Sequence, residues 1–244
     1  MVDCPHLRFD SAFVEEAVFL KVKALGEDNS WTKTFHARRE ELYDSRIPVQ
    51  GREKAFQAFY EKCFMESGLR EIFEGIVREF SPLSVSGLSI FVQRVWTKKE
   101  EESELYVQGE AKTVYVGLQT LRVLDRFFLE AFLRFEFMHI CDMLNAHFRY
   151  APDPILGGET EAQNNLMRDR FRLLWDLYVE ARLKKKGHPL LVPAQDRDRD
   201  FGKIFSFLDE DRRGTVLRRI AEENSLTQAD LLDLAGCRGC QGVR

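Results

Sequence analysis

The sequence predicts an α+β protein that is mostly helical, with a small mixed or antiparallel sheet of about three strands next to a long helix that carries a candidate motif. Apolar residues repeat at helical spacing through much of the chain, and short β-branched and aromatic runs replace this pattern between residues 88 and 118. The chain has 244 residues, of which 44% are hydrophobic, so it is long enough to bury a sizeable core.

The N-terminal third shows helical periodicity in three segments. Asp10 or Ser11 can cap a first helix that Gly26 ends. A second helix is predicted for residues 51–68, where aromatic residues follow the i, i+3, i+4 spacing of one helix face. A third runs from Leu69 to Phe80 and stops at a Ser-Pro pair, because proline disfavours a helical residue before it.

Three strands are predicted next, at residues 88–96, 104–108 and 112–118, from their β-branched and aromatic content. The last two flank Gly109 and read as a hairpin. The charged run that precedes them, TKKEEESE, is interpreted as a solvated loop.

Long helices follow the strands. The first begins at Thr120 or Asp125 and ends near residue 145, and a capping box of Thr160 with Gln163 starts a second that ends at Gly187. Thr227 with Asp230 caps one more helix near the C-terminus. We therefore expect a single domain over residues 1–190 and a helical C-terminal extension, residues 191–244, packed on it.

Composition restricts the classes of function. The chain has 36 basic and 40 acidic residues and a formal net charge of −4, so no overall positive field favours nucleic acid or an anionic membrane. The sequence has no run long enough to span a bilayer and no signal-peptide pattern. Five cysteines without framework spacing indicate reduced thiols. We expect a cytoplasmic protein, and the sequence leaves its oligomeric state open.

Residues 133–144, LRFEFMHICDML, place Glu136, His139 and Asp142 within an apolar helix. At about 100° per residue, His139 lies among phenylalanines, with Glu136 and Asp142 on either side of it. The opposite face carries the charged residues that are expected to be solvated: Arg126, Glu130 and Arg134. Buried ionisable groups are costly unless they have partners, so the inner set needs partners from another element.

The following helix carries side chains of the required kinds. Arg170 lies in its apolar arc and can neutralise Asp142 or Glu136. Asp176 and Glu180 lie four residues apart along one edge, and Glu180 can approach His139. One interpretation of this pattern is a structural polar network formed by Asp142, Arg170 and Asp176. The other interpretation is a metal site.

The order of elements, with strands ending in KTVYVGL, a helix bearing FEFMH and a helix bearing WDLYVEARL, resembles the zincin metallopeptidase scaffold, in particular its gluzincin-like members. The resemblance covers residues 85–185. It implies that Glu136 stands at the position of the general base, His139 at the second zinc ligand and Glu180 at the third. Phe135 stands where the family has its first histidine ligand, and phenylalanine offers no lone pair to zinc.

We therefore expect a zincin-like protein that has lost peptidase activity, holds no cofactor and binds a protein or peptide partner in a regulatory role. One alternative is a metal-dependent hydrolase or peptidase in which His139, Glu180 and a further acid hold zinc. A second alternative is a purely structural helical interaction protein. Separately, Cys237 and Cys240 can form a zinc site with Cys4 and His6. The spacing of Cys237 and Cys240 is typical of zinc ligands, but the second Cys-x-x-Cys pair of such sites is missing.

Overall fold

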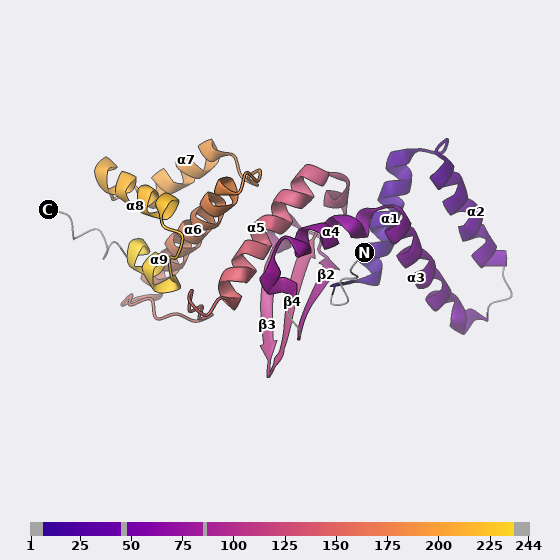
Figure 1. Ribbon diagram of the computed structural model, residues 1–244, viewed down its shortest axis with the longest axis horizontal. Helices are drawn as coiled ribbons and strands as arrows, with labels where there is room; N and C mark the ends of the chain where they lie inside the picture. The colour runs from indigo at the N-terminus through magenta and orange to yellow at the C-terminus, as the bar shows by residue number, and fades with distance from the viewer. Residues whose placement is uncertain (1–6, 45–47, 85–86, 237–244) are drawn as a thin grey trace. The chain divides into compact units, whose positions relative to one another are not determined.

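The computed structural model describes residues 7–44, 48–84 and 87–236 (Figure 1). It confirms an α+β protein that is mostly helical. Its internal contacts divide the chain into two compact units, Met1–Phe137 and Met138–Arg244, and the division falls inside one long helix. Each unit is described by itself below.

Unit 1 contains a helical N-terminal part, a sheet and the start of the long helix. Its elements are β1 (Leu7–Phe9), α1 (Ser11–Leu25), α2 (Ser30–Asp44), α3 (Val49–Glu66), α4 (Leu69–Arg78), β2 (Leu88–Arg94), β3 (Ser103–Gln108), β4 (Ala111–Leu118) and the first part of α5 (Arg126–Leu144). Short 3₁₀ turns lie at Ser81–Ser84, Lys98–Glu100 and Thr120–Leu124. The predicted cap at Asp10 is confirmed, since its carboxylate accepts a hydrogen bond from the Phe13 N–H.

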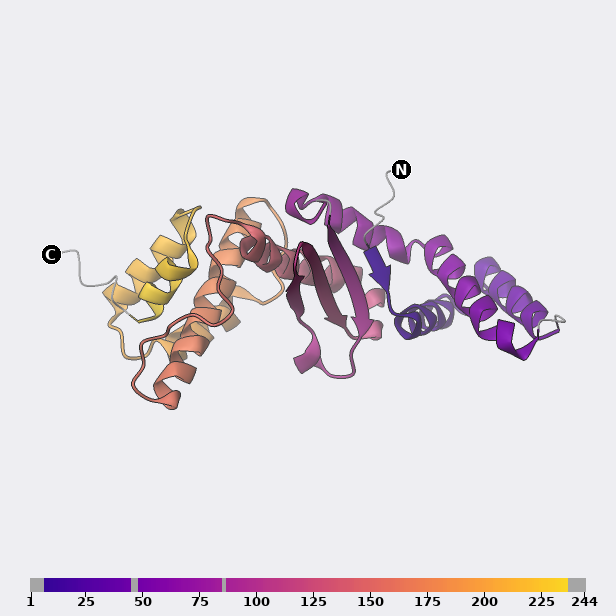
Figure 2. The ribbon, with the colours of Figure 1, turned by 90° about the horizontal axis from the view of Figure 1, so that it is seen from below.

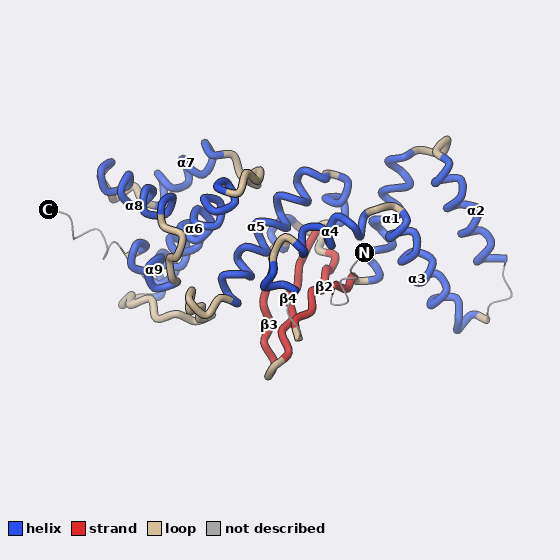
Figure 3. Tube along the Cα trace, in the orientation of Figure 1, coloured by secondary structure: helices blue, strands red, loops and turns tan. Residues whose placement is uncertain are grey.

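The sheet has the strand order β1-β2-β4-β3 (Figures 2 and 3). β1 runs parallel to β2 and β2 parallel to β4, whereas β3 pairs with β4 in the antiparallel direction. The three predicted strands and the hairpin at Gly109, which has a φ of 61°, are confirmed. β1 was not predicted, because a strand of three residues is too short to show alternation.

The two faces of the sheet differ in chemistry. One face is covered and carries the buried side chains Leu88, Ile90, Val92, Val114, Val116 and Leu118. Side chains on the other face alternate with these and include Phe91, Tyr115 and Tyr106, whose rings follow one another across three strands. The sheet is therefore covered on one side and open on the other, as is common where an antiparallel edge is present.

Phenylalanines form much of the helical core of unit 1. The Phe9 ring lies 5.0 Å from that of Phe64 and 5.1 Å from that of Phe73, which joins β1 to α3 and α4. α2 was not predicted from the sequence. Of its described side chains only Thr32 and Phe35 are buried, so its apolar periodicity is weak.

Unit 2 contains the rest of α5 followed by α6 (Glu161–Lys185), α7 (Ala194–Ile204), α8 (Glu210–Glu222) and α9 (Gln228–Ala235). The predicted capping boxes at Thr160 and Thr227 are confirmed. α6 packs against α7, α8 and α9, so the C-terminal helices share a core with α6. Within the described ranges, no helix has both the length and the apolar composition of a membrane span.

Candidate functional site

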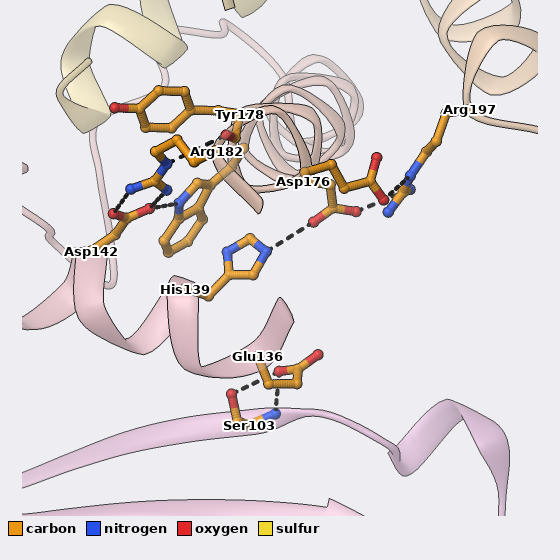
Figure 4. A network of polar contacts seen from close by, with 10 residues as sticks. Ser103, Glu136, His139, Asp142, Asp176, Tyr178, Arg182 and Arg197 are labelled. Atoms are coloured by element: carbon orange, nitrogen blue, oxygen red, sulfur yellow. Dashed lines mark hydrogen bonds and ion pairs between the residues drawn. The ribbon is translucent and has the colours of Figure 1, made fainter. Parts of the chain in front are cut away.

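Glu136 belongs to unit 1 and is bound to the edge of the sheet (Figure 4). Its Oε2 atom accepts hydrogen bonds from the backbone N–H of Ser103 at 2.8 Å and from the Ser103 hydroxyl at 2.7 Å. Ser103 is the first residue of β3. The Glu136 carboxylate, which the sequence predicted as a candidate general base, therefore attaches the motif helix to the antiparallel edge strand.

His139 lies in unit 2, where it is buried beside α6. Its Nε2 atom is 3.3 Å from Oδ1 of Asp176, and its ring lies edge-on to Trp175 with centroids 4.6 Å apart. The second oxygen of Asp176 is 3.2 Å from Nη1 of Arg197, a residue of α7. His139 thus faces a carboxylate that an arginine also neutralises (Figure 4).

Glu180 is buried and receives a hydrogen bond from Nε of Arg197 to Oε1 at 2.9 Å. Burial raises the pKa of its carboxyl above the ordinary value, and the Arg197 guanidinium opposes that rise. Because the folded pKa exceeds the unfolded one, the native state binds more protons between the two values. The contribution of Glu180 to stability therefore falls as pH rises through that interval.

Asp142 is the most completely paired acid of the motif. Nη1 of Arg182 donates to Oδ1 at 2.7 Å, Nη2 donates to Oδ2 at 2.5 Å, and the Trp175 indole N–H donates to Oδ2 at 2.8 Å. The prediction that Arg170 pairs with Asp142 is therefore wrong. Arg170 instead lies 4.1 Å above the Phe207 ring.

The correct arginine had a signal in the sequence. Arg182 follows Tyr178 by four residues and lies 4.0 Å above its ring, so both project from the same side of α6. Asp142 comes near the end of α5, and Arg182 lies about three helical turns nearer the end of α6 than Arg170 does. Ser103 and Arg197, by contrast, come from elements whose approach to the motif is not encoded in local spacing.

The prediction that Arg126, Glu130 and Arg134 are all solvated is wrong for Arg134. Arg134 is buried and forms a two-pronged ion pair with Glu79, with Nε and Nη2 each 2.8 Å from a carboxylate oxygen. Glu130 bridges Arg134 and Arg126, and only Arg126 is well exposed. The helix wheel placed the three charges correctly on one stripe, but it cannot show that Glu79, just after α4, reaches that stripe.

The residues as placed do not fit a catalytic zinc ion. A zinc ligand must direct a lone pair at the metal, whereas Glu180 directs its carboxylate at Arg197, Nε2 of His139 faces Asp176, and Phe135 has no donor atom. In the part of the chain that the structure describes, no three His, Cys, Asp or Glu side chains are grouped so that they could hold a metal.

The cysteines provide no second centre within the described residues. Cys63 and Cys141 are free thiols, and burial raises their pKa values to about 11 and about 12. Such thiols are poor nucleophiles at neutral pH, because the thiolate is the reactive form. The predicted zinc site of Cys4, His6, Cys237 and Cys240 lies outside the described residues.

Comparison with known proteins adds no relative: no family model, no curated protein and no solved structure matches this chain.

Proposed function

We propose that this protein is a zincin-like binding module without peptidase activity, which holds an extended segment of a partner protein along the outer edge of β3. The observation that carries the proposal is the pair of hydrogen bonds from Ser103 to Glu136. A general base must be within reach of a water molecule or a substrate proton. Here the carboxylate instead positions the first residue of the strand to which a peptide would be added.

The edge of β3 supplies the hydrogen-bonding groups for such an addition. The backbone N–H of Gly117 donates to the backbone carbonyl of Glu102 at 2.9 Å, so the backbone hydrogen-bonding groups of Glu102 point toward β4. Backbone groups alternate along an antiparallel strand, so those of Ser103, Leu105 and Val107 point outward. Among the described strands β3 pairs with β4 alone. Glu136 accepts from Ser103, which leaves the groups of Leu105 and Val107 to pair with an added strand.

The opposite edge of the sheet is less suited to this role. β1 has three residues, and Nη2 of Arg70 lies 3.4 Å from the Leu7 carbonyl oxygen. A strand this short, with a carbonyl already bound by an arginine, offers few groups to a partner. β3 is longer, and it leads through β4 into α5, the order of elements that the zincin resemblance implies. The free thiols of Cys63 and Cys141 support a cytoplasmic location as part of the proposal.

The proposal is tested by selecting a random library of displayed peptides on the whole protein, with Val107→Pro as the counter-selection. Proline removes the outward N–H of Val107 and leaves the ladder with β4 intact. Clones should bind the wild type and the matched control Val107→Thr, which keeps the N–H, and should lose binding to Val107→Pro. Circular dichroism and melting curves establish that both variants fold. Failure to recover clones that distinguish the two variants would refute the proposal.

A further inference from the structure

The open face of the sheet has a hollow of about 400 Å³ beside β3. It is lined by Arg94 at the end of β2, by Trp96 and Glu102 of the connection between β2 and β3, by Glu104 of β3 and by Tyr115 of β4. Glu104 lies directly opposite Tyr115 in the β3 and β4 register, so the two side chains share the open face. The hollow therefore adjoins the edge at which the proposed segment is added.

The wall of this hollow is preformed by the backbone between β2 and β3. Oε2 of Glu100 accepts hydrogen bonds from the N–H groups of Trp96 and Thr97, both at 2.9 Å. Gln119 Nε2 donates to the Trp96 carbonyl at 2.8 Å. The connection lies so close to β4 that a Cβ atom on Gly117 would be 2.5 Å from the Glu100 carbonyl oxygen. A ligand would therefore meet a wall whose shape is already fixed, which lowers the entropic cost of binding.

The charged groups that line the hollow differ in their hydrogen-bond and ion-pair partners. The Arg94 guanidinium is 3.3 Å from Glu16 and lies 4.2 Å above the Trp96 ring. Glu100 is held by backbone N–H groups, and these bonds lower its pKa. Lys99, an exposed residue of the connection between β2 and β3, is the second cation of the lining. Glu102 and Glu104 are exposed at the start of β3, where Glu104 accepts a hydrogen bond from the Tyr106 hydroxyl. The border of the hollow nearest the β3 edge is thus acidic and aromatic.

An added strand would bring its own side chains to this border. Alternate residues of that strand project on the open face, and directly opposite partners have Cβ atoms about 4.5–5.5 Å apart. A cation opposite a carboxylate stabilises such a pair, and a like charge destabilises it. An ammonium or guanidinium group there can also approach the ring of Tyr106, which is 54% exposed.

We infer that the segment bound at β3 carries a lysine or arginine whose side chain crosses Glu104 and enters the border of the hollow beside Tyr115. The ligand class is therefore an extended basic peptide. The inference rests on the proposed function, since it requires a strand at the β3 edge. It adds a side-chain preference that backbone pairing does not by itself impose.

The same peptide library tests the preference. Clones that bind the wild type and fail on Val107→Pro should be enriched in lysine or arginine at alternate positions. A synthetic peptide of the most enriched sequence should bind the double variant Glu102→Gln with Glu104→Gln at least about fivefold more weakly by fluorescence anisotropy. Glu110→Gln, which removes one negative charge from the hairpin turn outside the hollow, should leave its affinity unchanged.

The outcomes separate the two proposals. Clones that depend on Val107 but show no basic preference would overturn this inference and leave the proposed function standing. The same holds for an unchanged affinity in the double glutamine variant. Absence of any Val107-dependent clone removes the proposed function and the inference together. A dimer that Val107→Pro converts to monomer would identify a second copy of the chain as the occupant, and this also overturns the inference.

Discussion

Replacement of Arg182 by methionine tests the polar network of unit 2 at its most buried ion pair. The Asp142 side chain is 4% exposed and that of Arg182 18%. The substitution removes two charge-assisted hydrogen bonds from Asp142 and leaves it only the indole N–H of Trp175. It also removes the guanidinium from the face of Tyr178. Methionine retains most of the aliphatic volume, so the change acts mainly through charge.

The expected loss follows from the burial of the remaining acid. Removing one partner of a buried pair costs roughly 3–5 kcal/mol, because the other charge is left uncompensated. Trp175 still donates one hydrogen bond to Asp142, so we expect the lower end, about 3 kcal/mol. For a unit of about a hundred residues, each kcal/mol lowers Tm by roughly 4–8 °C, so a loss of about 3 kcal/mol lowers Tm by roughly 12–24 °C.

Differential scanning calorimetry of the whole protein measures this shift. Arg126→Met is the matched control, since the Arg126 side chain is 76% exposed and its ion pair with Glu130 contributes about 1 kcal/mol or less. Arg170→Met is a second control, because its guanidinium lies over Phe207 rather than Asp142. A loss for Arg182→Met no larger than that for Arg126→Met would show that the Asp142 pair is solvated and would refute the reasoning.

Three further results are expected. Gly117→Ala should destabilise unit 1 by about 1–3 kcal/mol, because its Cβ would be 2.5 Å from a carbonyl oxygen. Gly75→Ala should stabilise unit 1 slightly, because Gly75 lies in a helix with no atom within 4 Å of the added Cβ. Urea denaturation of the two variants compares these effects. Burial raises the pKa of Glu180, so Glu180→Gln should lessen the loss of Tm as pH rises above 4.5. Arg126 lowers the pKa of Glu130, so Glu130→Gln should lessen the loss of Tm as pH falls. Melting curves across pH 3–8 would contradict this if the dependence of Tm on pH in both variants matched that of the wild type. Elemental analysis of a variant with Cys237→Ser and Cys240→Ser should find less than one zinc per chain, because Arg197 already binds Glu180. Stoichiometric zinc in this variant would contradict our conclusion that His139 and Glu180 do not hold the metal.

Local patterns in the sequence determined the fold class and most of the elements. The caps at Asp10, Thr160 and Thr227 depend on a side chain three residues from its acceptor or donor, and the strand pattern depends on alternation within a few residues. These interactions are short in sequence, so they are visible without the fold. Segments with weak periodicity, such as α2, or with only a few residues, such as β1, lack that signal.

For the candidate site, the helix wheel established that His139 and Asp142 are buried polar residues of an apolar helix, and their burial is confirmed. It also favoured Glu180 as a neighbour of His139, whereas in the structure Nε2 of His139 lies beside Asp176 and Glu180 accepts a hydrogen bond from Arg197. Periodicity shows which side of a helix a residue occupies. An ionisable group on the side that carries the phenylalanines is expected to be buried and removed from water.

Only the tertiary structure decided which partners those groups have. Ser103 reaches Glu136 from 33 residues away, Arg182 reaches Asp142 from 40, and Arg197 reaches Glu180 from another helix. A wheel gives the direction of a side chain but not the axial offset or the distance between two packed elements. The choice between Arg170 and Arg182, or between a solvated and a buried Arg134, depends on that offset, because an ion pair requires its atoms within about 4 Å.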